Sequence, residues 1–441
     1  MTAGEGRATE AESGAAAETE GRAMAETVES AAEIEAEIAA YAGRIQTRDR
    51  RAEGAARALV DNLVKPTGSL GVLEELAVML AGIFGRLDYR IEDKANIIFC
   101  GDNGVFEEGY GKYPRQISRL VAEIMAAGKG GGSLLARTLG ARTRIVNLGL
   151  RGRYREGETI PAAAGRGAGS VAGFRAGDGA EGAGFAAVEG AGPDAAGGGA
   201  GLAAADITAT ERLVCPAGTG NITVGPALTR QQACQALRIG IEETEALIRQ
   251  GARVIAAGEI GLGNTTTAAA VLAVFTGLPP ADLTGMGSGT TGPALERKIA
   301  AVERALAVNR PAAADPIGVL AKVGGLDIAA MTGAYLACGV HRVPAALDGF
   351  IAQAAAFGAA ALRPLVKEYM IPAHISGEKG APLAAAALGL RPPVLRLDMR
   401  LGEGTGACLL FPLLDCAAAM LREMATFDDL ARWFPADWPP A

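Results

Sequence analysis

The acidic residue Glu403 stands between two glycines, in the run Arg400-Leu401-Gly402-Glu403-Gly404-Thr405-Gly406. Neighbours without side chains leave the Glu403 carboxylate open to a ligand, and burial in a partly dry cleft would raise its pKa toward that of a useful general base. Alternatively, Glu403 only interacts with the positive end of the apolar helix that it precedes. Without further context, this motif favours the alternative.

A second motif, Gly258 to Thr267, reads Gly-Glu-Ile-Gly-Leu-Gly-Asn-Thr-Thr-Thr and joins a predicted strand to an alanine-rich helix. Free amides at a helix N-terminus, unobstructed by Cβ atoms and flanked by hydroxyls, form a natural phosphate site. An ordinary strand-to-helix turn capped by Asn264 or Thr265 would look the same. The motif alone leaves both interpretations open.

A third motif, Gly285 to Gly292, contains the G-x-G-x-x-G pattern and precedes a helix bearing Lys298. The preceding residues Asp282 to Thr284 make a poor buried strand, and no suitable acidic residue ends a following strand, which argues against a Rossmann dinucleotide site. A second anion-contacting loop with Lys298 as a point charge is one interpretation. A solvated lysine on a helix is the other.

Three further glycine-containing segments, Lys65 to Gly71, Gly101 to Val105 and Ser376 to Gly380, are weaker signals. The second ends a predicted strand, where ligand sites of parallel sheets lie. A lone histidine such as His374 is more often structural than catalytic, and the lack of paired His, Asp or Cys argues against a catalytic triad or metal site.

The composition excludes several classes of function. A net charge of -7 argues against binding to nucleic acid or anionic lipid. Six cysteines without a C-x-x-C pair, and only two histidines, suggest neither a zinc site nor a disulfide framework. The N-terminus lacks a secretory signal, and the longest uncharged stretch, Ile260 to Ala281, carries Pro279-Pro280 and several glycines, unlike a bilayer span. We therefore expect a cytoplasmic protein without a membrane partner.

The chain divides by composition. Residues 1–29 form an acidic stretch low in large apolar residues and are predicted to be a disordered tail, and the Gly/Ala-rich residues 162–205 a flexible insertion. Residues 30–94 are expected to give the helical N-terminal part of a small subdomain. Residues 95–161 and 206–425 are expected to form an α/β catalytic domain, followed by a C-terminal tail at 426–441.

Apolar runs alternate with segments of helical periodicity. Strands are predicted at Ala95–Cys100, Thr143–Leu148, Arg253–Ala257 and Val343–Leu347. Helices are predicted within Ile34–Val64 and at Gln116–Ala127, Arg230–Gln250, Thr265–Thr276, Pro293–Asn309, Asp327–Cys338 and Gly404–Met424. This alternation favours a mostly parallel sheet with helices on both faces, a Rossmann-like three-layer α/β fold whose ligand lies beyond the carboxyl ends of the strands.

Taken together and in order, these segments resemble the nicotinate-nucleotide:dimethylbenzimidazole phosphoribosyltransferase family, from about Leu63 to Met424. The matching segments are Lys65–Leu73, Asp102–Val105, Gly258–Thr267, Lys322–Asp327, Leu347–Ile351, Ser376–Ala381 and Met399–Ala407. Single loops of these types arise by chance, whereas their joint occurrence at the family's separations is specific.

The resemblance implies that Glu403 is the catalytic base. The substrate-binding residues that it implies are Glu259, Gly261, Gly263, Asn264, Thr265, Thr266, Ser288, Gly289, Thr290, Lys298, Leu401, Gly402, Asp102, Asn103, Tyr113 and His374. Three positions depart from the family pattern. Asn103 stands where His is usual, Ala373 where Ser is common, and Tyr113 replaces a small polar residue of the base pocket, which leaves the acceptor base open.

The resemblance also implies a reaction, in which the phosphoribosyl group of nicotinate mononucleotide moves to 5,6-dimethylbenzimidazole or a similar base, giving an α-ribazole phosphate for the lower ligand of cobalamin. It implies a homodimer that needs no cofactor and no metal. A transferase with another azole, a purine or a phenol as acceptor remains an alternative, as does a non-catalytic nucleotide-binding homologue.

Overall fold

The computed structural model describes residues 29–111, 113–150 and 207–433. Its centre is a six-stranded sheet in the order β3-β2-β1-β4-β5-β6, with every neighbouring pair parallel. The strands are β1 (Lys94–Gly101), β2 (Ala141–Gly149), β3 (Ile207–Glu211), β4 (Val254–Ile260), β5 (Ala345–Leu347) and β6 (Met370–Pro372). This is a doubly wound order that reverses between β1 and β4. The predicted parallel α/β sheet is confirmed.

Both faces of the sheet are covered, as the apolar strands require. In β1 every residue is buried. Ile97 and Phe99 point into the larger core, whereas Ile98 and Cys100 point to the opposite face and meet Met125. Strands buried on both sides read as continuous apolar runs rather than as an alternating pattern.

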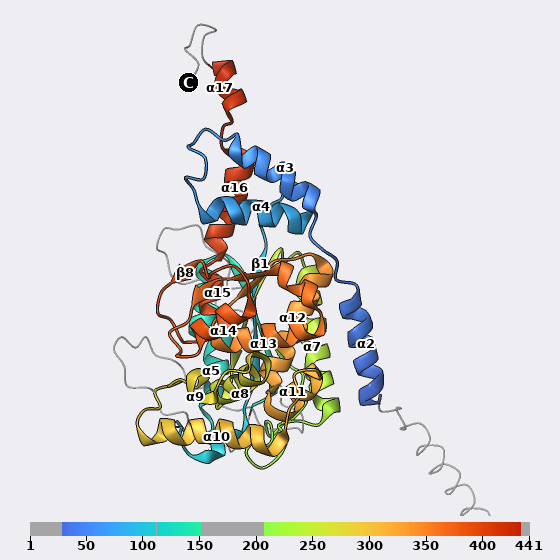
Figure 1. Cartoon of the computed structure of the whole chain (residues 1–441), viewed down its shortest axis with the longest axis vertical. Coiled ribbons are helices and arrows are strands. Elements are labelled where there is room, and N and C mark those ends of the chain that lie inside the picture. The colour runs from blue at the N-terminus through green and yellow to red at the C-terminus, as the bar shows by residue number, and fades with distance from the viewer. Residues whose placement is uncertain (1–28, 112, 151–206, 434–441) are drawn as a thin grey trace, which may run out of the picture.

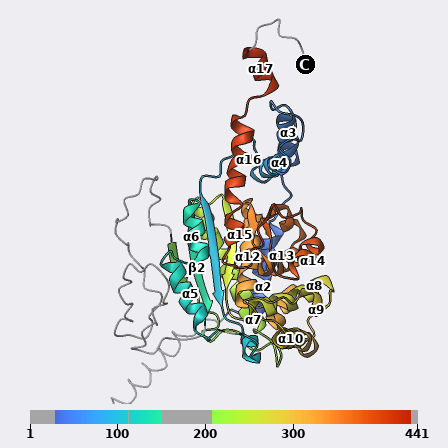
Figure 2. The ribbon, with the colours of Figure 1, turned by 90° about the vertical axis from the view of Figure 1, so that its left-hand side faces the viewer.

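The helices form the two outer layers, which Figure 2 shows on either side of the sheet. One layer contains α7 (Arg230–Arg249), α8 (Asn264–Thr276), α12 (Leu326–His341) and α13 (Phe350–Leu362), and the other contains α5 (Ile117–Ala126), α6 (Gly131–Thr138) and α15 (Thr405–Cys408). The remaining elements of this domain are η1 (Gly104–Glu108), α9 (Pro280–Leu283), α10 (Pro293–Asn309), α11 (Pro316–Val323), η3 (Pro364–Tyr369), α14 (Ala381–Leu388) and the short parallel pair β7 (His374–Ile375) and β8 (Leu395–Arg396).

A small group of helices projects from one end of the sheet domain (Figure 1). It comprises α3 (Arg50–Asp61), α4 (Val72–Phe84), α16 (Phe411–Glu423) and α17 (Phe427–Trp433). An antiparallel bridge between Leu63 and Thr426 joins its N-terminal and C-terminal parts. The smaller helical subdomain thus combines segments from both ends of the described chain.

Helix α2 (Ala31–Gly43) differs from the expected assignment of residues 30–94 to the subdomain. It lies along α7 of the sheet domain, with Ile34 and Ile38 buried and a 2.7 Å ion pair between Arg230 and Glu35. Its apolar side chains therefore find their partners on α7 rather than on α3 or α4.

The helix predicted at Gly404–Met424 is divided into α15 and α16. Pro412 lies in the first turn of α16, because a proline farther inside a helix would remove a backbone hydrogen bond. Residues 405–423 are the one helical stretch of the described chain with the length and hydropathy that a membrane span requires, and 56% of its most apolar window is buried inside the protein. The predicted tail at 1–29 (except for Glu29), the insertion at 162–205 and positions 434–441 lie outside the described residues.

Candidate active site

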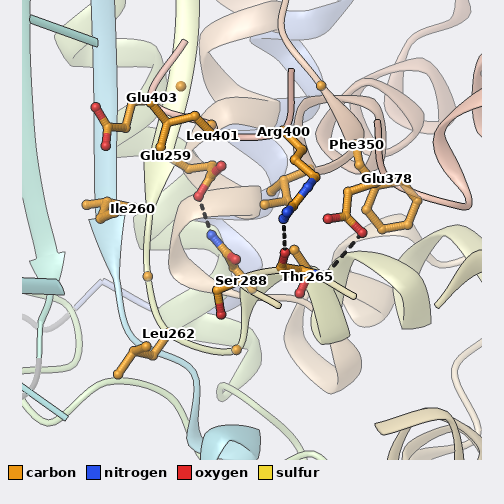
Figure 3. A pocket seen from close by; sticks show the side chains of 18 of the residues that line it. Glu259, Ile260, Leu262, Thr265, Ser288, Phe350, Glu378, Arg400, Leu401 and Glu403 are labelled. Atoms are coloured by element: carbon orange, nitrogen blue, oxygen red, sulfur yellow. Dashed lines mark hydrogen bonds between the residues drawn. The ribbon is translucent and has the colours of Figure 1, made fainter. Parts of the chain in front are cut away.

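A cavity of about 560 Å³ opens at the carboxyl ends of β4 and β5, next to the point where the strand order reverses. Most of the residues predicted to contact substrate line it. They are Glu403, Glu259, Gly261, Gly263, Asn264, Thr265, Ser288, Thr290, Lys298, Leu401, Gly402, Tyr113 and His374. Loops that are far apart in the sequence therefore converge on one hollow, part of which Figure 3 shows.

Glu403 is a buried carboxylate, with 4% of its surface exposed. Its Oε2 accepts a 2.7 Å hydrogen bond from the Gly132 amide in the first turn of α6. Burial raises the pKa of Glu403, the Gly132 amide opposes that rise, and the negative charge of Asp348 adds to it. The carboxylate thus contacts the N-terminus of α6, not that of α15, the helix it precedes in sequence.

The backbone around Glu403 is held in an unusual conformation. Gly402, Glu403 and Gly404 have φ values of 87°, 61° and 72°, in the left-handed region that non-glycine residues rarely adopt. The buried Asn96 side chain donates a 2.9 Å hydrogen bond to the Glu403 carbonyl oxygen. A Cβ atom at Gly258 would lie 2.1 Å from the Gly404 nitrogen, so the loop packs directly on the backbone of β4.

A second carboxylate, Glu259, follows the glycine of β4 on which this loop packs. Its backbone carbonyl accepts a 3.2 Å hydrogen bond from the Glu403 amide, and its Oε2 accepts one from the Asn264 side chain. Burial raises the pKa of Glu259 well above its usual range, and the nearby charges of Asp327, Asp348 and Glu403 raise it further. Such a cluster favours the protonated form of Glu259 or a ligand that brings positive charge.

The N-terminus of α8 forms the polar end of the cavity. Its helix begins after Gly263, whose φ of 83° suits a glycine. In the part of the chain that is described, the first-turn amides of Asn264 and Thr265 have no hydrogen-bond acceptor. Lys298 on α10 donates to the Thr265 hydroxyl at 2.9 Å. Two amides, a hydroxyl and an ammonium group together suit a bound phosphate.

Lys298 is 2% exposed, so it is not the solvated lysine of the alternative interpretation. Its Nζ also donates a 2.8 Å hydrogen bond to the Gly285 carbonyl oxygen. Burial lowers its pKa to about 8, although the charge of Glu378 opposes the decrease. An incoming anion would favour the ammonium form further, because an opposite charge nearby stabilises it.

The turn at Gly285–Ser288 forms one wall between the two ends of the cavity. The Gly287 amide donates a 3.3 Å hydrogen bond to Oε2 of Glu378, and the Gly287 carbonyl accepts one from Arg400 (Figure 3). The Gly287 amide is therefore already occupied by a carboxylate of the protein.

A buried histidine–carboxylate pair lies behind Glu403. Nε2 of His374 lies 3.3 Å from Oδ1 of Asp348, which also accepts a 3.1 Å hydrogen bond from the Ala407 amide. Both side chains line the cavity. Nε2 of His374 thus faces the carboxylate that raises the pKa of Glu403, whereas its buried Nδ1 has no hydrogen-bond partner among the described residues.

The opposite end of the cavity is lined by larger and more exposed side chains. Leu401 is 60% exposed, Tyr113 48% and Met286 40%. Ile260 and Leu262 also line the cavity. An apolar planar ring would be able to pack among these side chains, within reach of the loop that carries Glu403.

The predicted residues that do not line the cavity are Asp102, Asn103, Thr266 and Gly289. Asp102 accepts a 2.9 Å hydrogen bond from the Leu262 amide, and Asn103 donates to the Leu262 carbonyl at 3.2 Å. These two side chains hold the Gly261–Gly263 turn from behind. The Thr266 hydroxyl is hydrogen-bonded to Tyr110, and Gly289 supplies a φ of 110° within its turn.

Comparison with known proteins decides the relationship. A family model described as a phosphoribosyltransferase matches residues 45–431. The nicotinate-nucleotide–dimethylbenzimidazole phosphoribosyltransferases of Desulforudis audaxviator and Geobacter metallireducens are 39% and 38% identical to the chain, over 88% and 84% of it and 95% and 91% of those proteins. The chain belongs to this phosphoribosyltransferase family.

Solved structures agree with that membership. The crystal structure of CobT from Thermus thermophilus matches with a TM-score of 0.70 at 33% identity, covering 86% of this chain and 98% of that one. A nicotinate-nucleotide–dimethylbenzimidazole phosphoribosyltransferase structure from the same organism gives the same TM-score over 87% of this chain. The resemblance inferred from the sequence is confirmed, and with it the expectation of a phosphoribosyltransferase.

Several cavity-lining polar residues were not among the predicted contacts, chiefly Asp348, Ser376, Glu378 and Arg400. All four lie in segments that carry the family resemblance, and that resemblance could have identified them as candidate contacts. Individual motifs do not show which side chain of a segment turns toward a cavity, and that orientation depends on how the segments pack.

Proposed function

We propose that the protein transfers the phosphoribosyl group of nicotinate mononucleotide to 5,6-dimethylbenzimidazole or a similar base, releasing nicotinate. The product is an α-ribazole 5'-phosphate, which serves in the lower ligand of cobalamin. Family membership supports this reaction, because the matched relatives carry the name of the corresponding enzyme.

The polar end of the cavity would bind the nucleotide. The 5'-phosphate would rest on the free amides of Asn264 and Thr265, beside Ser288, with the Lys298 ammonium group as its counter-charge. Donors on helices are fixed before the ligand arrives, so they contribute chiefly by positioning it. Glu259 would lie near the ribose, where its acidic surroundings favour the positive charge that develops at C1'.

Glu403 would act as the general base. The pyridinium nitrogen of the nucleotide leaves C1' with the electrons of the broken bond and becomes neutral. One nitrogen of benzimidazole attacks C1' from the opposite face, and the proton on its other nitrogen passes to the Glu403 carboxylate. Attack from that face inverts C1' and converts a β-nucleotide into an α-nucleotide.

One observation carries the proposal: a buried carboxylate of raised pKa shares a cavity with the free amides of a helix N-terminus and a buried lysine. General-base catalysis is typically worth roughly a hundred- to ten-thousandfold in rate, and a carboxyl group with a raised pKa is better suited to it. This combination fits a reaction between a phosphorylated sugar and a weakly acidic N–H.

The direct test is an assay of the purified protein with nicotinate mononucleotide and a panel of acceptors, including benzimidazoles, purines and phenols. We expect release of nicotinate together with an α-nucleotide of 5,6-dimethylbenzimidazole. Faster transfer to a purine or a phenol would favour the alternative acceptor class, which the exposed Tyr113 and Leu401 side chains make physically reasonable. Absence of transfer to every base would favour a non-catalytic homologue.

We further propose that the enzyme is a cytoplasmic homodimer. The cysteines of the described chain are all free, and most are buried, which is typical of a reducing compartment. The dimer is supported by the family resemblance. Sedimentation analysis of the purified protein would test it, and a monomer at micromolar concentration would contradict it.

A further inference from the structure

The loop that carries Glu403 has a strained backbone, and contacts on both sides of residues 402–404 are needed to hold it. Three consecutive residues with positive φ include one non-glycine, a strained conformation that persists only when surrounding contacts impose it. On the C-terminal side the loop is well held. Thr405 donates a 2.8 Å hydrogen bond to the Gly402 carbonyl, and Asn96 donates to the Glu403 carbonyl.

On the N-terminal side the contacts are few. The short strand β8 ends at Arg396, and the carbonyl of Met399 accepts a 2.9 Å hydrogen bond from the Gly377 amide. Leu401, which follows, is largely exposed. The side chain of Arg400 therefore provides the main polar contact between this part of the loop and the cavity wall. Its guanidinium group donates a hydrogen bond to the Gly287 carbonyl.

The Gly285–Ser288 turn is a firm support for that contact. Glu378 accepts from the Gly287 amide, and Lys298 donates to the Gly285 carbonyl. Both of these side chains are buried and come from other segments. Arg400 thus ties a strained loop to a turn that is held independently on two sides, as Figure 3 shows for the side chains of Arg400 and Glu378.

We propose that Arg400 is a positioning residue that holds the Glu403 loop against the Gly285–Ser288 turn. It acts on catalysis through Glu403, and this role rests on the proposed function of Glu403 as the base. Glu378 and Lys298 hold the turn without Arg400. The polar end of the cavity, at the start of α8, therefore keeps its geometry when Arg400 is replaced.

The kinetic test compares Arg400→Met, Arg400→Lys and the control Lys379→Met. Lys379 also donates to a backbone carbonyl of a neighbouring segment, that of Ala281 at 2.7 Å, but it is exposed and lies outside the cavity lining. We expect Arg400→Met to lower kcat about tenfold and to change the dissociation constant of nicotinate mononucleotide less than about threefold. Arg400→Lys should recover part of kcat, and Lys379→Met should match the wild type.

A double mutant separates positioning from direct binding. If Arg400 acts through Glu403, adding Arg400→Met to Glu403→Gln should lower kcat less than about twofold further, because the group being positioned is already gone. Multiplication of the two single effects would overturn the proposal. So would a variant whose only defect is weaker nucleotide binding, since that result would make Arg400 an anion ligand.

A measurement without substrate keeps this test independent of the reaction. We expect amide hydrogen exchange in residues 401–405 to rise about tenfold in Arg400→Met and to stay unchanged in Lys379→Met, with thermal unfolding recorded for both. Unchanged exchange in Arg400→Met would overturn the positioning role even if transfer were detected. Raised exchange in a protein that transfers nothing would instead reject the proposed function and keep the structural coupling.

Discussion

The two ends of the cavity are built differently. The polar end, which we propose binds the phosphate and call the phosphate end, consists of backbone amides at the start of α8 and a lysine that is 2% exposed, all on regular helices. The base end consists of a carboxylate on a strained loop, surrounded by side chains such as Leu401 and Tyr113 that are about half exposed. One end is rigid before any ligand arrives, whereas the other has side chains that can still move.

This contrast indicates which part of recognition is fixed by the fold. Amides at a helix N-terminus donate hydrogen bonds to the phosphate of any nucleotide, so that end binds firmly but discriminates little between nucleotides. The exposed apolar side chains at the other end determine which ring fits. Differences in acceptor among family members are therefore expected to arise at the base end, which Tyr113 and Leu401 line.

The largest effect is expected from Glu403→Gln, which should impair turnover at the base end of the cavity and leave the phosphate end unaffected. We expect kcat to fall at least tenfold, on the order of 1.4 kcal/mol or more, with nearly unchanged nucleotide binding. Because burial raises the pKa of Glu403, wild-type kcat should decline with falling pH well before an ordinary carboxyl group would protonate. Steady-state kinetics across pH would check both, and a mutant with undiminished turnover would remove Glu403 from this role.

At the phosphate end, Lys298→Met should weaken nucleotide binding by roughly tenfold to a hundredfold, because a hydrogen bond from a charged group is lost. The Lys298 pKa of about 8 adds a pH dependence. Its ammonium form prevails below that pH, so affinity should decrease as pH rises through and above 8. Calorimetric titration with nicotinate mononucleotide measures this, and a pH-independent affinity would argue that Lys298 does not face the phosphate.

Gly258→Ala should disturb the base end through backbone packing alone. Its new Cβ would meet the Gly404 nitrogen at 2.1 Å, so we expect a loss of about 1–3 kcal/mol in the free energy of unfolding and a lower kcat. Gly225→Ala is the matched control, because nothing lies within 4 Å of a Cβ atom there. Denaturant titration measures the free energy of unfolding of both variants. Equal values would mean that the Glu403 loop shifts to accommodate the new Cβ atom at little cost.

The smallest effect is expected from Leu401→Ala. Since this side chain is largely exposed, its truncation should change the ratio of kcat/KM between two acceptor bases only about threefold, on the order of 0.7 kcal/mol. Nucleotide affinity should remain unchanged. If this substitution altered nucleotide affinity more than acceptor choice, the division of the cavity into two independent ends would be wrong.

Much of the fold could be predicted because apolar runs and helical periodicity are local. The four predicted strands are all present, but β3 and β6 of the main sheet and the short pair β7 and β8 were not predicted. Pro372 ends the three residues of β6, and β3 reads Ile-Thr-Ala-Thr-Glu directly after the Gly/Ala-rich segment. Short edge strands of this kind depend on their neighbours in the sheet, and no period within the strand itself identifies them.

The site was predicted less completely, for a different reason. Glycine motifs locate turns, and Glu403, Glu259 and Lys298 do line one cavity. Whether an individual polar group in a turn faces the ligand depends on contacts with distant segments. The Gly287 amide, which donates to Glu378, and the Asn103 side chain, which supports Leu262, illustrate this point.

The hydrogen bond between the Gly132 amide at the start of α6 and Glu403 also affects how readily this carboxyl group loses a proton. A carboxylate that has just received a proton attracts the Gly132 amide less than an ionised one does, and the hydrogen bond favours loss of that proton. The helix terminus therefore keeps the pKa of Glu403 below the value that burial alone would give, so the proposed base releases its proton to solvent more readily once the product has left.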